Sequence, residues 1–217
     1  GTVMLPKVSR MTRMKQMDAV KRHIRLSMEL VMCMVCAMAF GLAAVAVNFA
    51  PLFYGDDFAY SGTLMMPLAF TLLSIGFANV IRTQWVLPQG RDTIFVHSVL
   101  TGAVINLIAN FVLIPPFGAM GAAAATVLAE FSVPAVQFVY LRKELPYAQY
   151  LKTTGVYCLF GLVMAGAVVL LGHVLPLHGW GKLAVQVTGG AAVYGALCLT
   201  YWKLAKRSDI FRLMRRK

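Results

Sequence analysis

Three polar residues fall at helical spacing within one long apolar stretch of the chain. Glu130 is near the middle of residues 119–141, with Thr126 four residues before it and Gln137 seven residues after it. On a helix, this spacing places the three side chains on one face. Ionisable groups at bilayer depth are costly and are often functional. The face could hold a carboxylate that responds to protons or cations, accept hydrogen bonds from substrate hydroxyls, or join neighbouring helices.

Five further polar residues are candidates for the same substrate pathway. Asn106 and Asn110 are four residues apart in the third apolar stretch, so they share a helix face and can form hydrogen bonds between helices. Asn79, Arg82 and Gln84 stand at the end of the second apolar stretch. The guanidinium of Arg82 is suited to pairing with phosphate. A cation at this position can equally snorkel to the lipid head groups.

Other residues with reactive side chains are given structural roles. Asp56 and Asp57 are adjacent in a short connection, as solvated turn and helix-capping residues often are. Cys33 and Cys36 have the C-x-x-C spacing of a redox or zinc pair, but they lie within an apolar stretch, where a thiol behaves as a small buried side chain. We expect no catalytic residues, no metal site and no cofactor.

The composition indicates the elements that position these residues. Of the 217 residues, 59% are apolar and only 13% are charged, and the mean hydropathy is +0.73. Soluble domains carry about twice that charged fraction, roughly a quarter. A helix that crosses a bilayer needs about 20 apolar residues, and six stretches qualify: 29–50, 62–81, 95–114, 119–141, 154–175 and 183–202. The expected fold is an all-α polytopic membrane protein with six transmembrane helices.

The basic residues alternate with these stretches. Nineteen of the twenty Lys and Arg residues lie before the first stretch or after the second, fourth and sixth; Lys182 is the exception. Cytoplasmic loops of membrane proteins retain Lys and Arg, so we expect both termini in the cytoplasm. The net charge of +12 is therefore read as a topology signal, and no nucleic-acid partner is expected. Residues 1–26 read as a basic amphipathic segment on the membrane surface, and residues 203–217 as a basic cytoplasmic tail.

Several segments together resemble a known family. They are GTVMLPKVSR (1–10), APLFYG (50–55), NVIRTQWVLPQG (79–90), NLIAN (106–110) and GAMGA (118–122) continuing through Thr126 to Glu130. In order and spacing they resemble the C-terminal half of bacterial polysaccharide-biosynthesis flippases, members of the multidrug/oligosaccharidyl-lipid/polysaccharide exporter superfamily. The resemblance covers about residues 1–145. It divides the membrane part into family-like helices, 27–145, and two further transmembrane helices, 146–202.

The resemblance implies a function as well as a fold. Such proteins have two lobes around a central cavity and move undecaprenyl-pyrophosphate-linked oligosaccharide across the bacterial cytoplasmic membrane for envelope polysaccharide assembly. The chain would then be the C-terminal part of a multi-pass transporter and not an enzyme. Its partners would be the lipid-linked oligosaccharide, membrane lipids and a missing N-terminal lobe. Two alternatives stay open: a membrane polymerase or ligase of glycan synthesis, and a membrane subunit that does not transport.

Overall fold

The computed structural model describes residues 9–10, 14, 16–174, 176 and 178–204, and this part of the chain contains helices and no strand. The main elements in chain order are α2 (Met17–Tyr54), α3 (Ala59–Ala69), α4 (Thr71–Ile81), α5 (Asp92–Leu141), α6 (Tyr147–Val174) and α7 (Gly179–Leu204). Short irregular helices connect them: 3-10 turns at Asp56–Phe58 and Leu87–Gln89, and a π-helical turn at Arg82–Val86. The prediction of an all-α membrane protein is confirmed.

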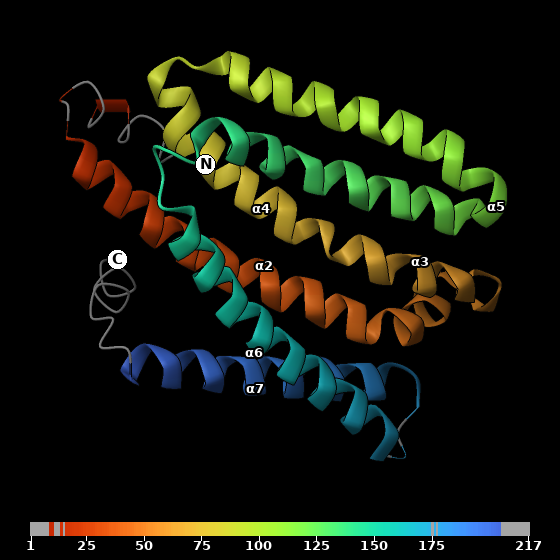
Figure 1. Ribbon diagram of the computed structural model, residues 1–217. Helices are drawn as coiled ribbons and strands as arrows, with labels where there is room; N and C mark the ends of the chain where they lie inside the picture. The colour runs from red at the N-terminus through yellow and green to blue at the C-terminus, as the bar shows by residue number, and fades with distance from the viewer. Residues whose placement is uncertain (1–8, 11–13, 15, 175, 177, 205–217) are drawn as a thin grey trace.

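The six predicted spans appear as five long apolar helical stretches, because two of them form one element. Helix α5 reverses direction at Gly118, whose backbone (φ 55°, ψ −131°) lies in a region that favours glycine. Its two arms, predicted as residues 95–114 and 119–141, run antiparallel in Figure 1. They pack so closely that a Cβ atom on Gly121 would overlap the carbonyl oxygen of Leu113. The spans of α5 thus form a tight helical hairpin.

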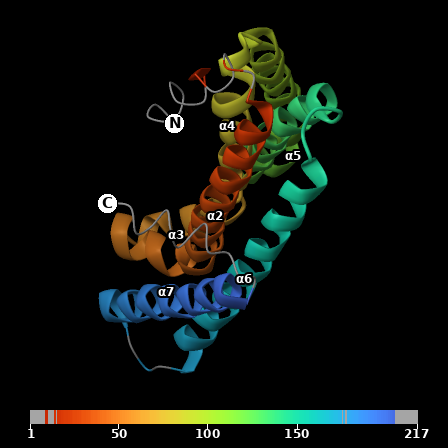
Figure 2. The same cartoon turned by 90° about the vertical axis from the view of Figure 1, so that its left-hand side faces the viewer.

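Helix α2 forms the centre of the bundle. Figures 1 and 2 show it between α3, α4 and α5 on one side and α6 and α7 on the other. Its buried residues contribute to the main apolar core, which also includes residues of α4, α6 and α7, among them Val20, Ile24, Met28, Met32, Cys36, Ile81, Tyr157, Met164 and Cys198. The second span is interrupted at Phe70, between the end of α3 at Ala69 and the start of α4 at Thr71.

The segment predicted to lie on the membrane surface differs over its described residues. Residues 17–26 are the first turns of α2 and continue without a break into the first span. Val20 and Ile24, which would face lipid in a surface helix, are buried in the protein core. Most of the preceding residues, 1–8, 11–13 and 15, lie outside the described part of the chain, as does the predicted basic tail from residue 205 onward.

The helix ends that carry most of the basic residues lie together at one end of the bundle, as the charge pattern predicts. The start of α2, the turn after α4, the connection between α5 and α6 and the end of α7 lie at one end of the bundle, on the left of Figure 1. The turns between α2 and α3, between the arms of α5 and between α6 and α7 lie at the other end. The basic end is therefore separated by the length of the spans from the end that carries Asp56, Asp57 and Lys182.

Candidate functional site

A cavity of about 690 Å³ lies between α4 and the two arms of α5. Six of the eight predicted pathway residues line it, together with apolar neighbours: Ile75, Ala78, Asn79, Arg82, Phe95, Val99, Gly102, Ala103, Asn106, Thr126, Ala129, Glu130, Val133 and Gln137. Val99 and Ala103 are exposed, so the cavity opens at the surface of the bundle. The face predicted from the spacing of Thr126, Glu130 and Gln137 is directed into this space.

Arg82 is the cation of the cavity. It begins the π-helical turn Arg82–Val86, directly after α4. One terminal nitrogen donates a hydrogen bond to Asn79 Oδ1 at 2.8 Å, and the guanidinium carbon lies 4.8 Å from the centre of the Phe95 ring. Its Nε is buried and has no hydrogen-bond partner among the described residues. The side chain is thus held from two sides and still has a donor available for an anion.

Glu130 lies half-buried opposite α4. Its backbone carbonyl accepts a hydrogen bond from the hydroxyl of the buried Ser74, which joins this point of α5 to α4. No hydrogen bond or ion pair joins its carboxylate to another residue in the described ranges. Thr126 donates its hydroxyl proton to Ala122 O on its own helix at 3.0 Å, so it presents a lone pair and a methyl group to the cavity.

Among Thr126, Glu130 and Gln137, Gln137 lies nearest the basic end of the bundle. It is buried, and its Oε1 has no hydrogen-bond partner in the described part of the chain. An unpaired buried carbonyl is unfavourable by about 1–3 kcal/mol. A hydroxyl donor from water or from a bound molecule in the cavity would satisfy it.

The remaining predicted residues are placed differently. Asn110 donates to Asn106 Oδ1 at 3.0 Å, so the pair is bonded within one helix arm and not between helices. Asn106 lines the cavity, and Asn110 does not. Gln84 also lies away from the cavity; it is buried within the π-helical turn, and its Oε1 is unpaired among the described residues.

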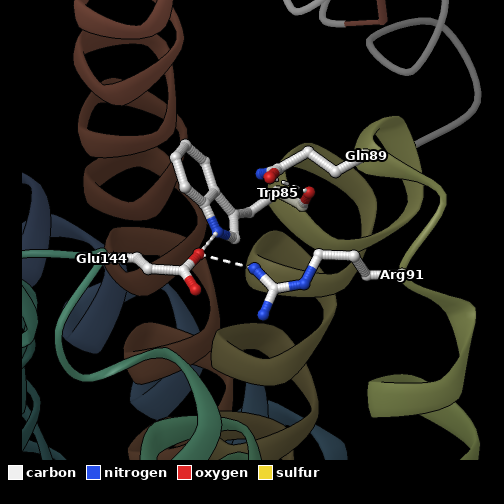
Figure 3. A network of polar contacts seen from close by, with 4 residues as sticks. All are labelled: Trp85, Gln89, Arg91 and Glu144. Carbon is white, nitrogen blue, oxygen red and sulfur yellow. Dashed lines mark hydrogen bonds and ion pairs between the residues drawn. The ribbon is translucent and has the colours of Figure 1, made fainter.

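A polar cluster supports Arg82 from the basic end of the bundle (Figure 3). Glu144 Oε2 accepts hydrogen bonds from Arg91 at 2.6 Å and from Trp85 Nε1 at 3.0 Å. Gln89 donates to the Trp85 carbonyl at 3.1 Å. The cluster ties the turn that carries Arg82 to the connection between α5 and α6. Partial desolvation raises the pKa of Glu144, but the hydrogen bonds from Arg91 and Trp85 and the charges of Arg91 and Lys21 outweigh it and lower the pKa.

A second cluster lies inside the bundle, between α2, α6 and α7. Glu29 is completely buried, and its Oε1 accepts a hydrogen bond from the Tyr157 hydroxyl at 3.2 Å. Trp202 Nε1 in turn donates to the Tyr157 oxygen at 2.9 Å. The sequence pattern does not indicate Glu29 or Tyr157 as functional residues. The signal that could have found them is a carboxylate at the first position of an apolar stretch, where a buried charge needs a partner.

Fold and cavity together define a class: a multi-span helical membrane lobe with an arginine-bearing polar cavity open at its surface. The family model described as "Lipid II flippase MurJ" matches residues 1–188. The chain belongs to this family of transporters. The predicted resemblance to a lipid-linked glycan flippase family is confirmed, and the match extends beyond residue 145 to the last span.

Two comparisons with individual proteins agree with this assignment. The chain is 22% identical over 202 residues to the "Probable low-salt glycan biosynthesis flippase Agl15" of Haloferax volcanii, covering 93% of this chain and 42% of that protein. It is similar in fold to a solved structure of "Lipid II flippase MurJ, inward closed conformation", with a TM-score of 0.77, 16% identity and the same coverage of 93% and 42%. The chain thus spans less than half the length of these relatives.

Proposed function

We propose that the chain is the C-terminal part of a flippase that translocates undecaprenyl-pyrophosphate-linked oligosaccharide across the bacterial cytoplasmic membrane for cell-envelope polysaccharide assembly. The observation that carries the proposal is the cavity of α4 and α5, with a positioned arginine and a line of polar side chains in an otherwise apolar wall. The family membership supports transport over the alternative of a glycan polymerase or ligase.

Arg82 would bind the pyrophosphate. An arginine forms paired, charge-assisted hydrogen bonds with phosphate oxygens, and the bond to Asn79 orients the guanidinium for this contact. Asn106, Glu130 and Gln137 would exchange hydrogen bonds with sugar hydroxyls farther along the wall. Polar side chains at bilayer depth are unfavourable unless they have a partner. A polar saccharide that passes along this wall would supply such partners.

A second lobe would complete the cavity. The chain spans 42% of the length of its relatives, and the cavity, which is lined by residues of α4, the turn after it and α5, opens at the surface of the bundle. We propose that an N-terminal lobe covers this opening and that the two lobes rock about the cavity in alternating access. A non-transporting membrane subunit is the second candidate, because the same short span is compatible with it.

The orientation follows from the charges. Translocating Lys and Arg across the membrane is disfavoured, so we propose that the basic end of the bundle, with the start of α2 and the end of α7, faces the cytoplasm. Arg82 is then at the cytoplasmic end of α4, on the side from which a lipid-linked substrate enters.

The test compares two substitutions that keep the charge. Arg82→Lys removes the paired geometry but not the cation, whereas Arg142→Lys makes the same change at an exposed residue outside the cavity. The purified chain is titrated with a fluorescent undecaprenyl-pyrophosphate saccharide, and flipping is measured in proteoliposomes with and without the N-terminal half of a family member. One lost charge-assisted bond, about 1.5–3 kcal/mol, predicts binding weaker by about 10-fold to 150-fold in the Arg82 variant only.

Two results would contradict parts of the proposal. Unchanged binding by the Arg82→Lys variant would exclude paired hydrogen bonding between Arg82 and the pyrophosphate. Saccharide binding without flipping, even with the N-terminal half present, would favour the non-transporting subunit.

A further inference from the structure

A second, smaller cavity of about 220 Å³ is lined by residues of α2, α6 and α7. It is lined by Arg25, Gln149, Lys152, Thr153, Val156 and Tyr201, and it shares no lining residue with the larger cavity. Its volume is about a third of that of the larger cavity and is too small for a lipid-linked saccharide chain. The transport function does not account for it.

The donors of this cavity suit a phosphate. Arg25 projects from α2 and Lys152 from α6; both are exposed, and neither forms an ion pair with an acidic residue in the described ranges. Gln149 and Thr153 add an amide and a hydroxyl, and they lie with Lys152 on one face of α6, at a spacing of three and four residues. All three are in the first two turns of α6, and Gln149 is in the first turn, at the positive end of the helix dipole.

The depth of the cavity indicates where its ligand comes from. Arg25 lies just before the apolar stretch 29–50, Lys152 just before 154–175, and Tyr201 at the end of 183–202, so the cations stand at the level of the lipid head groups. On the bilayer side the wall is apolar: Val156 continues the α6 face, and the Tyr201 ring packs on Phe160 with 5.7 Å between ring centres. A ligand here meets two cations at one end and an apolar wall at the other.

We propose that this cavity binds the head group of an anionic phospholipid of the leaflet at the basic end of the bundle. Arg25 pairs with the phosphodiester, Lys152 supplies the second charge, and Gln149 and Thr153 donate to the remaining phosphate or glycerol oxygens. Val156 and Tyr201 contact the start of the acyl chains. Basic cavities between transmembrane helices are a known mode of recognising anionic lipid head groups.

The experiment measures lipid retention by the full chain. The protein is placed in phosphatidylcholine nanodiscs with increasing phosphatidylglycerol, and the bound lipid is quantified by native mass spectrometry after release. The double variant Arg25→Gln/Lys152→Gln is compared with Arg142→Gln/Lys143→Gln, which removes the same charge from exposed residues that line neither cavity. A third arm adds inorganic phosphate to the wild type.

We expect the wild type and the control to retain phosphatidylglycerol in preference to phosphatidylcholine. The Arg25/Lys152 variant should lose this preference by about 30-fold, from two cations at about 1 kcal/mol each. An equal loss in both double variants would show a general charge effect and overturn the site. Displacement of the lipid by millimolar phosphate would overturn the assignment to a lipid. Arg25→Lys alone should weaken retention less than Arg25→Gln, and equal loss in the two variants would contradict a role of the Arg25 charge.

Discussion

Substituting Tyr157 tests the buried cluster that joins α2 to α6 and α7. Tyr157→Phe keeps the ring, which packs edge-to-face on Phe160, and removes the hydroxyl that donates to Glu29 and accepts from Trp202. Hydrogen bonds between membrane helices average about 0.6 kcal/mol and reach about 1.7 kcal/mol. The loss of two such bonds predicts destabilisation of about 1.2 kcal/mol, with an upper bound of about 3.4 kcal/mol.

The matched control is Tyr140→Phe. Tyr140 is exposed, and its hydroxyl contacts His97 Nδ1 at 3.2 Å near the membrane surface. The same chemical change there should alter stability by less than about 0.5 kcal/mol. The assay is reversible unfolding of the detergent-solubilised protein with SDS, and circular dichroism measures the fraction that remains folded. Equal effects of the two substitutions would refute the inference that the Glu29–Tyr157–Trp202 cluster holds α2 against α6 and α7.

Two further predictions concern other contacts of the structure. Cys33 and Cys198 have their sulfur atoms 3.7 Å apart, and Cys36 and Cys158 3.8 Å apart, so mild oxidation of membranes should link α2 to α7 and α2 to α6; peptide mapping that finds a Cys33–Cys36 link instead would contradict this packing. Glu144 has a lowered pKa, so its ion pair with Arg91 stabilises the fold above the ordinary pKa and is lost as the pH falls through the lowered value. Both side chains are about one-third exposed, so the effect should stay below about 1 kcal/mol. Glu144→Gln should be less stable than the wild type at pH 7, and the difference should shrink as the pH falls below the ordinary carboxyl pKa and through the lowered value. A difference independent of pH would argue against the ion pair.

Much of the fold can be predicted from the length of the apolar stretches and from the 3.6-residue period of the α-helix. Each predicted span corresponds to a helical segment, because a backbone at bilayer depth must satisfy its hydrogen bonds within the helix. The same period placed Thr126, Glu130 and Gln137 on one face, and that face lines the cavity. The charge pattern matches the separation of the helix ends, since basic connections alternate along the chain with connections that hold few or no cations.

Other features of the site depend on local backbone geometry and on long-range contacts, which the helical period of the sequence does not predict. The π-helical turn at Arg82–Val86 shifts the helical register. A regular extension of α4 is therefore a poor guide to where Gln84 points. Asn110 is bonded to Asn106 within its own helix, which the spacing of four residues also allows. The Arg91–Glu144 contact joins residues 53 positions apart. Nothing in the local sequence specifies that pairing.

The most direct test of the central claim places a photoreactive residue on either side of the first arm of α5. Val99 lines the cavity, whereas Val104 is exposed and does not line it, and the two directions differ by about 140° at about 100° per residue. Benzoylphenylalanine at each position is irradiated in membranes with a radiolabelled undecaprenyl-pyrophosphate saccharide. We expect the saccharide portion to be captured at position 99 and only lipid to be captured at position 104. Equal capture at both positions, or none at position 99, would contradict the placement of the substrate in the cavity.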